Sequence, residues 1–135
     1  TEATKEALSC VKILVVEDDP FLSPVITARL EEEGYAITLA TDGEKALAHI
    51  AHEIPDLILL DIVMPGVNGF DVLKAIKADK RLVDVSVVMF SNLGQEHEIE
   101  ECKKLGADAF LVKAKFTPRE VLQQIRDLLK KKGRI

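Results

Sequence analysis

The sequence predicts an α/β domain built on a doubly wound, five-stranded parallel sheet with five helices. Apolar, β-rich runs alternate with helical patterns along the 135 residues. Most of these runs are continuously apolar, as expected for strands that are buried on both faces. A helix separates each pair of consecutive strands, which requires right-handed crossovers and therefore parallel pairing. The length suits one domain that buries about two-thirds of the surface of its unfolded chain.

The first half of the chain predicts three strands and two helices. Strands are expected at 12–16, 36–40 and 57–60, with helices at 20–33 and 43–51. The first of these helices has clear end signals. Asp19-Pro20 provides an N-cap followed by a first-turn proline, and Gly34 provides the stop.

The second half continues the alternation. A helix is expected at 70–78, a strand at 86–90, a helix at 95–105, a strand at 109–112 and a last helix at 117–132. The sequence thus divides into a flexible lead-in or linker remnant at 1–10, a domain at 11–132 and a short tail at 133–135.

Composition narrows the class of protein. The formal charge of −5 argues against a dedicated nucleic-acid surface, and Lys130 to Lys132 fit a solvated last helical turn. No apolar stretch approaches the roughly 20 residues of a membrane helix, and no secretory signal is visible. Cys10 and Cys102 lack disulfide or zinc-site spacing, so reduced thiols and a cytoplasmic location are expected.

Polar residues end four of the expected strands. Asp61 follows the apolar run 57–60, and a second acidic cluster, Glu17 to Asp19, follows 12–16 in the same way. Taken alone, Asp61 is equally a turn-former or helix N-cap. In doubly wound sheets, however, ligands bind beyond the carboxyl ends of the strands, where Ser91 and Lys113 also lie.

These strand ends predict a metal site and a phosphoryl acceptor. Carboxylates of Glu17, Asp18 and Asp61 would repel one another without a cation, and oxygen-only ligands with room for a phosphate favour Mg²⁺. Lys113 beside apolar residues needs an anionic partner, either Asp61 or a phosphoryl group on it. Ser91 is either a strand-end cap or a donor to phosphoryl oxygens. Together they form the minimum set for placing a phosphoryl group on Asp61.

Zinc is not favoured, because no His or Cys falls at a strand end. His49 and His52 share a helix face without a third ligand and are expected to be surface residues.

Four motifs in order resemble the receiver domains of the two-component response-regulator family over about residues 11–131. The motifs are Ile13-Leu14-Val15-Val16-Glu17-Asp18-Asp19-Pro20, Leu57-Ile58-Leu59-Leu60-Asp61-Ile62-Val63-Met64-Pro65-Gly66 with Asn68-Gly69, Met89-Phe90-Ser91, and Gly106-Ala107-Asp108-Ala109-Phe110-Leu111-Val112-Lys113. The resemblance implies a flavodoxin-like fold with strand order 2-1-3-4-5. It also implies that Asp61 accepts a phosphoryl group from a histidine kinase or a histidine phosphotransfer protein.

The resemblance implies further roles for the site residues. Glu17, Asp18, Asp61 and the backbone carbonyl of Val63 would bind Mg²⁺. No direct contact with nucleic acid or membrane is expected, and the chain would be a monomer or a phosphorylation-linked dimer.

The switch is implied in the same way. Ser91 and Lys113 would contact the phosphoryl oxygens, and Phe110 would be the aromatic switch residue coupled to Ser91. The switch would change the face formed by the fourth helix, fifth strand and last helix, where an output partner would bind. A permanently buried core ring is the alternative for Phe110.

Three residues depart from the usual pattern of the family. Ala114 follows Lys113 where the family usually has proline in a cis bond. Because a cis bond before a non-proline residue costs about 2.5 to 4 kcal/mol, a trans bond and a shifted loop are expected. Val63 and Asn92 flank the expected path of attacking water, and Val63 offers no polar group, which suggests slow loss of the phosphoryl group.

Three other functions compete with a phosphorylated switch. An Asp-dependent phosphatase would need a general acid where Val63 stands. A flavodoxin-like electron carrier would place its phosphate against Glu17 to Asp19, which would repel it. A receiver-like interaction module that works without phosphorylation would not need the acceptor-site residues. The expected enzymatic activity is limited to the protein's own phosphorylation and dephosphorylation.

Overall fold

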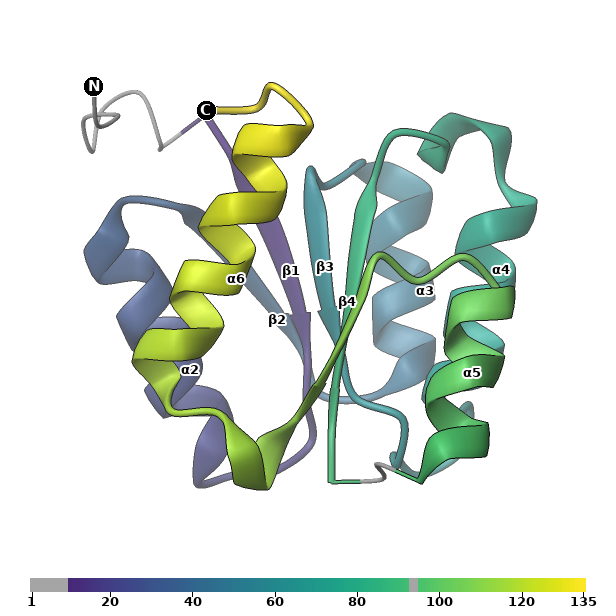
Figure 1. The fold of residues 1–135 in the computed structure, drawn as a ribbon. Coiled ribbons are helices and arrows are strands. Elements are labelled where there is room, and N and C mark those ends of the chain that lie inside the picture. Colours follow the sequence, from purple (N-terminus) through teal and green to yellow (C-terminus); the bar gives the residue numbers. More distant parts are fainter. Residues whose placement is uncertain (1–9, 93–94) are drawn as a thin grey trace.

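The computed structural model describes residues 10–92 and 95–135. Five parallel strands form one sheet in the order β2-β1-β3-β4-β5 (Figure 1). The predicted fold class and strand order are confirmed. The strands are β1 (Lys12–Val16), β2 (Ala36–Ala40), β3 (Leu57–Leu60), β4 (Ser86–Ser91) and β5 (Ala109–Val112).

Five α-helices cover the two faces of the sheet (Figure 1). One face packs against α2 and α6 through a core that includes Ile26, Leu30 and Ile125. The other face packs against α3, α4 and α5 through a second core. The helices are α2 (Leu22–Glu33), α3 (Gly43–His52), α4 (Gly69–Ala78), α5 (Glu96–Lys104) and α6 (Pro118–Lys131).

The register of the sheet aligns the strand ends that carry polar residues. Val16 lies opposite Leu60 in the neighbouring strand, and Ser91 lies opposite Val112. Beyond the last pair of β1 and β3, the Asp61 N–H still donates to the Val16 carbonyl at 3.1 Å. The residues that follow β1, β3 and β5 therefore leave the sheet at one common edge.

Burial on both faces holds for the central strands only. Every residue of β3 and β4 is buried, whereas the edge strand β2 is buried only at Ala40. An edge strand has a neighbour on one side only, and here the helices cover it less completely.

The start of α2 differs from the prediction. The helix begins at Leu22 and not at Pro20, because Asp19 closes a turn ahead of it. Asp19 Oδ1 accepts hydrogen bonds from the N–H groups of Phe21 at 2.8 Å and Leu22 at 3.2 Å. The prediction that Asp19 is the N-cap was wrong: the N-cap residue is Phe21, and the Asp19 side chain instead accepts hydrogen bonds within the turn that precedes the helix. Gly34 ends the helix with φ of 108°, a left-handed conformation that glycine adopts without strain.

The remaining helix ends lie within one residue of the predicted ends. Two short 3₁₀ helices, Lys80–Leu82 and Lys113–Lys115, were not predicted.

The described residues contain no cis peptide bond, so the Lys113–Ala114 bond is trans. This confirms the prediction made from the missing proline. The chain turns through the 3₁₀ helix Lys113–Lys115 and becomes extended at Phe116 before α6 begins.

The two ends of the chain were predicted to be a flexible lead-in and a short tail. Most of the expected lead-in, residues 1–9, lies outside the described residues. At the other end, Arg134 pairs with Asp56 at 3.0 Å and Ile135 packs against the core beneath α6.

Cys10 is exposed, Cys102 is buried, and both are free thiols. Within the described part, no helix has the length and apolar character needed to cross a membrane.

Candidate phosphoacceptor site

The polar residues at the strand ends surround one open hollow of about 470 Å³. Glu17 and Asp18 reach it from the end of β1, Asp61 from the end of β3, and Ser91 and Lys113 from the ends of β4 and β5. The topology thus brings together residues that are up to 96 positions apart in the chain. The lining residues are Glu17, Asp18, Asp19, Pro20, Asp61, Val63, Ser91, Asn92 and Lys113.

Asp61 is held in place by both of its carboxylate oxygens. Oδ1 accepts a hydrogen bond from the Ile62 N–H at 2.7 Å and a longer one from the Val63 N–H at 3.4 Å. Oδ2 accepts a hydrogen bond from Lys113 Nζ at 2.9 Å. Asp61 does not cap the next helix, since Asn68 is the N-cap of α4. The residue is 6% exposed and lines the hollow, so its carboxylate is both oriented and reachable.

Lys113 joins two carboxylates. Its Nζ forms ion pairs with Asp61 Oδ2 and with Glu17 Oε1, which supplies the anionic partner that its position predicts. It also lies 5.6 Å from the centre of the Phe90 ring, within the range of a cation–π contact. Burial alone would lower the pKa of Lys113, but the two carboxylates outweigh it and raise the pKa above its usual value. The ammonium therefore stays charged.

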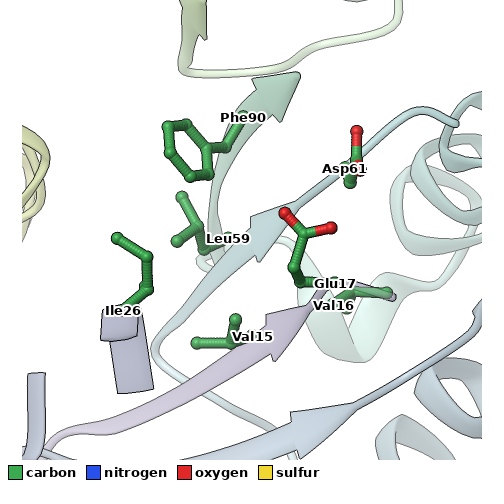
Figure 2. A pocket seen from close by; sticks show the side chains of 7 residues that line it. All are labelled: Val15, Val16, Glu17, Ile26, Leu59, Asp61 and Phe90. Atoms are coloured by element: carbon green, nitrogen blue, oxygen red, sulfur yellow. The ribbon is translucent and has the colours of Figure 1, made fainter. Parts of the chain in front are cut away.

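The Glu17 carboxylate lies beside apolar side chains. Figure 2 shows it near the carboxylate of Asp61, with Val15, Leu59 and Phe90 around its other side and Ile26 contributed by α2. Only 3% of Glu17 is exposed. This burial raises the pKa of Glu17 to about 7, and the nearby Asp61 charge adds to the rise while Lys113 opposes it. The carboxylate lacks a counter-charge strong enough to offset its desolvation.

The acidic residues fit a divalent cation. One carboxylate oxygen from each of Glu17, Asp18 and Asp61 lies within 4.8 Å of the others. Glu17 Oε1 is buried and pairs with Lys113 Nζ. The donors are all oxygens, which suits a hard cation such as Mg²⁺. No histidine or cysteine belongs to this group of residues, and it is the only such group within 10–92 and 95–135.

The other predicted site residues differ in position. Val63 is 57% exposed and lines the hollow together with the exposed Asn92. Ser91 is buried at the end of β4 and also lines it. Phe110 does not. It is partly buried against the core under α3, α4 and α5, one strand away from Met89.

Sequence reasoning missed the role of two glycines. A Cβ on Gly69 would lie 2.2 Å from the Asp61 carbonyl oxygen, and one on Gly43 would lie 2.4 Å from the Val67 carbonyl oxygen. Both glycines let the loop between β3 and α4 pack closely. The Gly69 N–H also donates to the Ile62 carbonyl at 2.8 Å. The Asn68-Gly69 pair was visible in the sequence, but its contact with Asp61 was not.

Comparison with known families agrees with this geometry. The family model described as the response regulator receiver domain matches residues 13–126. This chain belongs to that family. A receiver domain is a signalling domain of two-component systems and not a conventional enzyme.

Curated relatives of this receiver domain are longer proteins. The DNA-binding dual master transcriptional regulator RpaA of Synechocystis is 38% identical over 92% of this chain. The response regulator SaeR of Staphylococcus aureus is 36% identical over 87% of it. The chain spans about half the length of these relatives, 51% and 50% respectively.

Solved structures show the same fold. The receiver domain of the Francisella response regulator 1452 superimposes with a TM-score of 0.82 at 30% identity, over 90% of this chain and 98% of that one. The chemotaxis protein CheY4 of Vibrio cholerae gives 0.82 at 28% identity, over 88% of this chain and 98% of that one.

Proposed function

We propose that this receiver domain is a phosphorylation switch that accepts a phosphoryl group on Asp61 from a histidine kinase or a histidine phosphotransfer protein. The observation that carries the proposal is the environment of Asp61. Its carboxylate opens into the hollow, is fixed by backbone N–H groups and Lys113, and lies beside two further carboxylates. A structural aspartate would not need this arrangement.

The proposed transfer follows from the groups around Asp61. An Asp61 carboxylate oxygen attacks the phosphorus atom, so an O–P bond forms while the N–P bond of the phosphohistidine breaks. The electron pair goes to the imidazole nitrogen, which takes up a proton. Lys113 and Ser91 then donate hydrogen bonds to phosphoryl oxygens, and Lys113 exchanges its contact with the carboxylate for one with the phosphoryl group.

Glu17, Asp18 and Asp61 are the side chains proposed to hold Mg²⁺, with the backbone carbonyl of Val63 as a further ligand. When bound, Mg²⁺ supplies positive charge to the phosphoryl oxygens and offsets the repulsion among the carboxylates. The raised pKa of Glu17, caused by its burial and by the nearby Asp61 charge, supports this assignment.

Lys113 should compete with the metal, because it occupies carboxylates of the same site. Lys113→Gln is expected to tighten Mg²⁺ binding about tenfold, since two carboxylates lose their fixed counter-charge. Calorimetric titration at low salt measures this. Lys115→Gln, an exposed change in the same turn, is the matched control and should leave the affinity unaltered. Equal Mg²⁺ affinity in wild type and Lys113→Gln would show that the lysine does not shield the site.

Phosphorylation is proposed to change the face formed by α5, β5 and α6. In this proposal Ser91 moves toward the phosphoryl group and Phe110, one strand away, turns into the space released. Phe110 is only partly buried where it packs against the core, which supports a ring that can turn inward. The altered face would bind an output partner or domain, with the chain as a monomer or a phosphorylation-linked dimer.

Free thiols at Cys10 and Cys102 support a reducing cytoplasmic setting.

The test of this function is phosphorylation by a small donor. The protein is incubated with acetyl phosphate or phosphoramidate, with Mg²⁺ or with excess EDTA, and intact mass is measured. We expect one phosphoryl group per molecule that depends on Mg²⁺. Equal labelling in EDTA would contradict the metal assignment. An unlabelled protein would favour an interaction module that works without phosphorylation.

Loss of the phosphoryl group should depend on Val63, which is apolar and exposed at the mouth of the hollow. Val63→Asn provides a side chain that can orient attacking water, so hydrolysis should be about tenfold faster than in wild type. Decay of the labelled protein, followed after the donor is removed, gives the rates. Val83→Asn, at an exposed position outside the hollow, is the control. Equal rates in wild type and Val63→Asn would show that Val63 does not control the loss of the phosphoryl group.

A further inference from the structure

A second polar hollow lies between α2 and α6, which pack side by side on one face of the sheet (Figure 1). Its volume is about 140 Å³, and it shares no lining residue with the acceptor hollow. The lining residues are Glu33, Tyr35, Arg119, Leu122, Gln123 and Arg126.

Tyr35 is the unusual residue in this hollow. It is 4% exposed, and its hydroxyl is buried. The Arg126 guanidinium donates toward the hydroxyl oxygen, but the O–H has no acceptor in the part of the chain that the structure describes. Burial raises the pKa of Tyr35 while the charge of Arg126 and its hydrogen bond to the hydroxyl lower it, and the net shift is upward. The hydroxyl is therefore a protonated donor at neutral pH. A guanidinium offers donors only, so Arg126 cannot accept this proton.

The hollow carries a net positive charge. Arg126 donates from its guanidinium to Glu33 Oε2 at 3.0 Å. Arg119 is exposed and forms no ion pair within residues 10–92 and 95–135. One carboxylate therefore faces two guanidinium groups. Gln123 donates from Nε2 to Asp127 Oδ1 at 2.9 Å. The donors left to a ligand in the hollow are therefore the guanidinium groups and the Tyr35 hydroxyl.

We propose that this hollow binds a small oxyanion, a phosphate or carboxylate group. Its oxygens would accept the Tyr35 O–H and be held by the Arg119 and Arg126 guanidinium groups, whose planar forks suit both kinds of anion. Bound there, the anion would link α2 to α6. These helices follow the acceptor-site residues at the ends of β1 and β5. Binding would therefore make the backbone that carries the acceptor site more rigid. The proposal is independent of phosphorylation at Asp61.

The test is a titration of the whole chain followed by backbone amide NMR shifts at residues 35 and 119–126. Sodium phosphate and sodium acetate serve as separate probes, with sodium chloride holding the ionic strength constant. We expect saturable shifts. Tyr35→Phe, which removes only the hydroxyl, and Arg119→Gln should each weaken binding about fivefold or more. Lys130→Gln, on the same helix but outside the hollow, should change binding less than about twofold.

The two probes identify the source of the anion. Tighter binding of phosphate assigns the hollow to a phosphate group, and equal or tighter binding of acetate assigns it to a carboxylate. Shifts that stay linear with both salts would overturn the proposal. Unchanged affinity in Tyr35→Phe would overturn it as well, because the buried O–H without an acceptor is the observation on which it depends.

Discussion

Asp61→Asn is expected to abolish phosphoryl labelling by small donors. The amide keeps the shape of the carboxylate and can still accept the Ile62 N–H, but its oxygen is a neutral and much weaker nucleophile. The fold should persist, because Asn removes one of the crowded charges beside Glu17 without leaving a cavity. Intact-mass measurement after incubation with acetyl phosphate and Mg²⁺ reports the labelling, and circular dichroism reports the fold.

Asp71→Asn is the matched control for this substitution. Asp71 lies in the first turn of α4, is exposed, and does not line the hollow. Its labelling should equal that of wild type. Labelling that survives in a folded Asp61→Asn protein would mean that another residue accepts the phosphoryl group.

Gly69→Ala is expected to lower the free energy of unfolding by about 3 kcal/mol, at the upper end of the cost of overpacking. The added Cβ would lie 2.2 Å from the Asp61 carbonyl oxygen and 2.6 Å from the Ile62 Cα. Both neighbours are backbone atoms and cannot rotate away. The loop after β3 must shift, so labelling of Asp61 should also slow. Urea unfolding followed by circular dichroism gives the change in stability.

Gly133→Asn separates this effect from a general cost of replacing glycine. Gly133 has φ of 73°, and a Cβ there would meet no atom within 4 Å. Asparagine tolerates this conformation better than other residues, so the loss should stay below about 1 kcal/mol. Similar losses in both variants would show that close packing against Asp61 is not the reason for Gly69.

The sheet could be predicted because its strands are short apolar runs with clear ends. Parallel pairing then placed Glu17, Asp61 and Lys113 at one edge without any knowledge of side-chain positions. The start of α2 was predicted two residues early, since Asp19 closes a turn through its side chain and Pro20 marks the helix only approximately. Incomplete burial of β2 was missed because exposure depends on how fully the helices cover each strand.

Part of the site could not be predicted from sequence patterns. The shared pairing of Lys113 with Glu17 as well as Asp61, and its position over Phe90, depend on rotamers and packing across four strands. The contact between Gly69 and the Asp61 backbone joins residues on opposite sides of a loop. Such contacts form only when the folded elements pack together, and a sequence motif does not show how they will pack.

Chemical mapping of the phosphorylated residue tests the central claim most directly. Acyl phosphates are reduced by borohydride, so a phosphorylated aspartate becomes homoserine and can be located by peptide mass spectrometry. After labelling with acetyl phosphate and Mg²⁺, we expect homoserine at position 61 and at no other aspartate. Homoserine at Asp18 or Asp19 with an unmodified Asp61 would contradict the assignment of Asp61 as the acceptor.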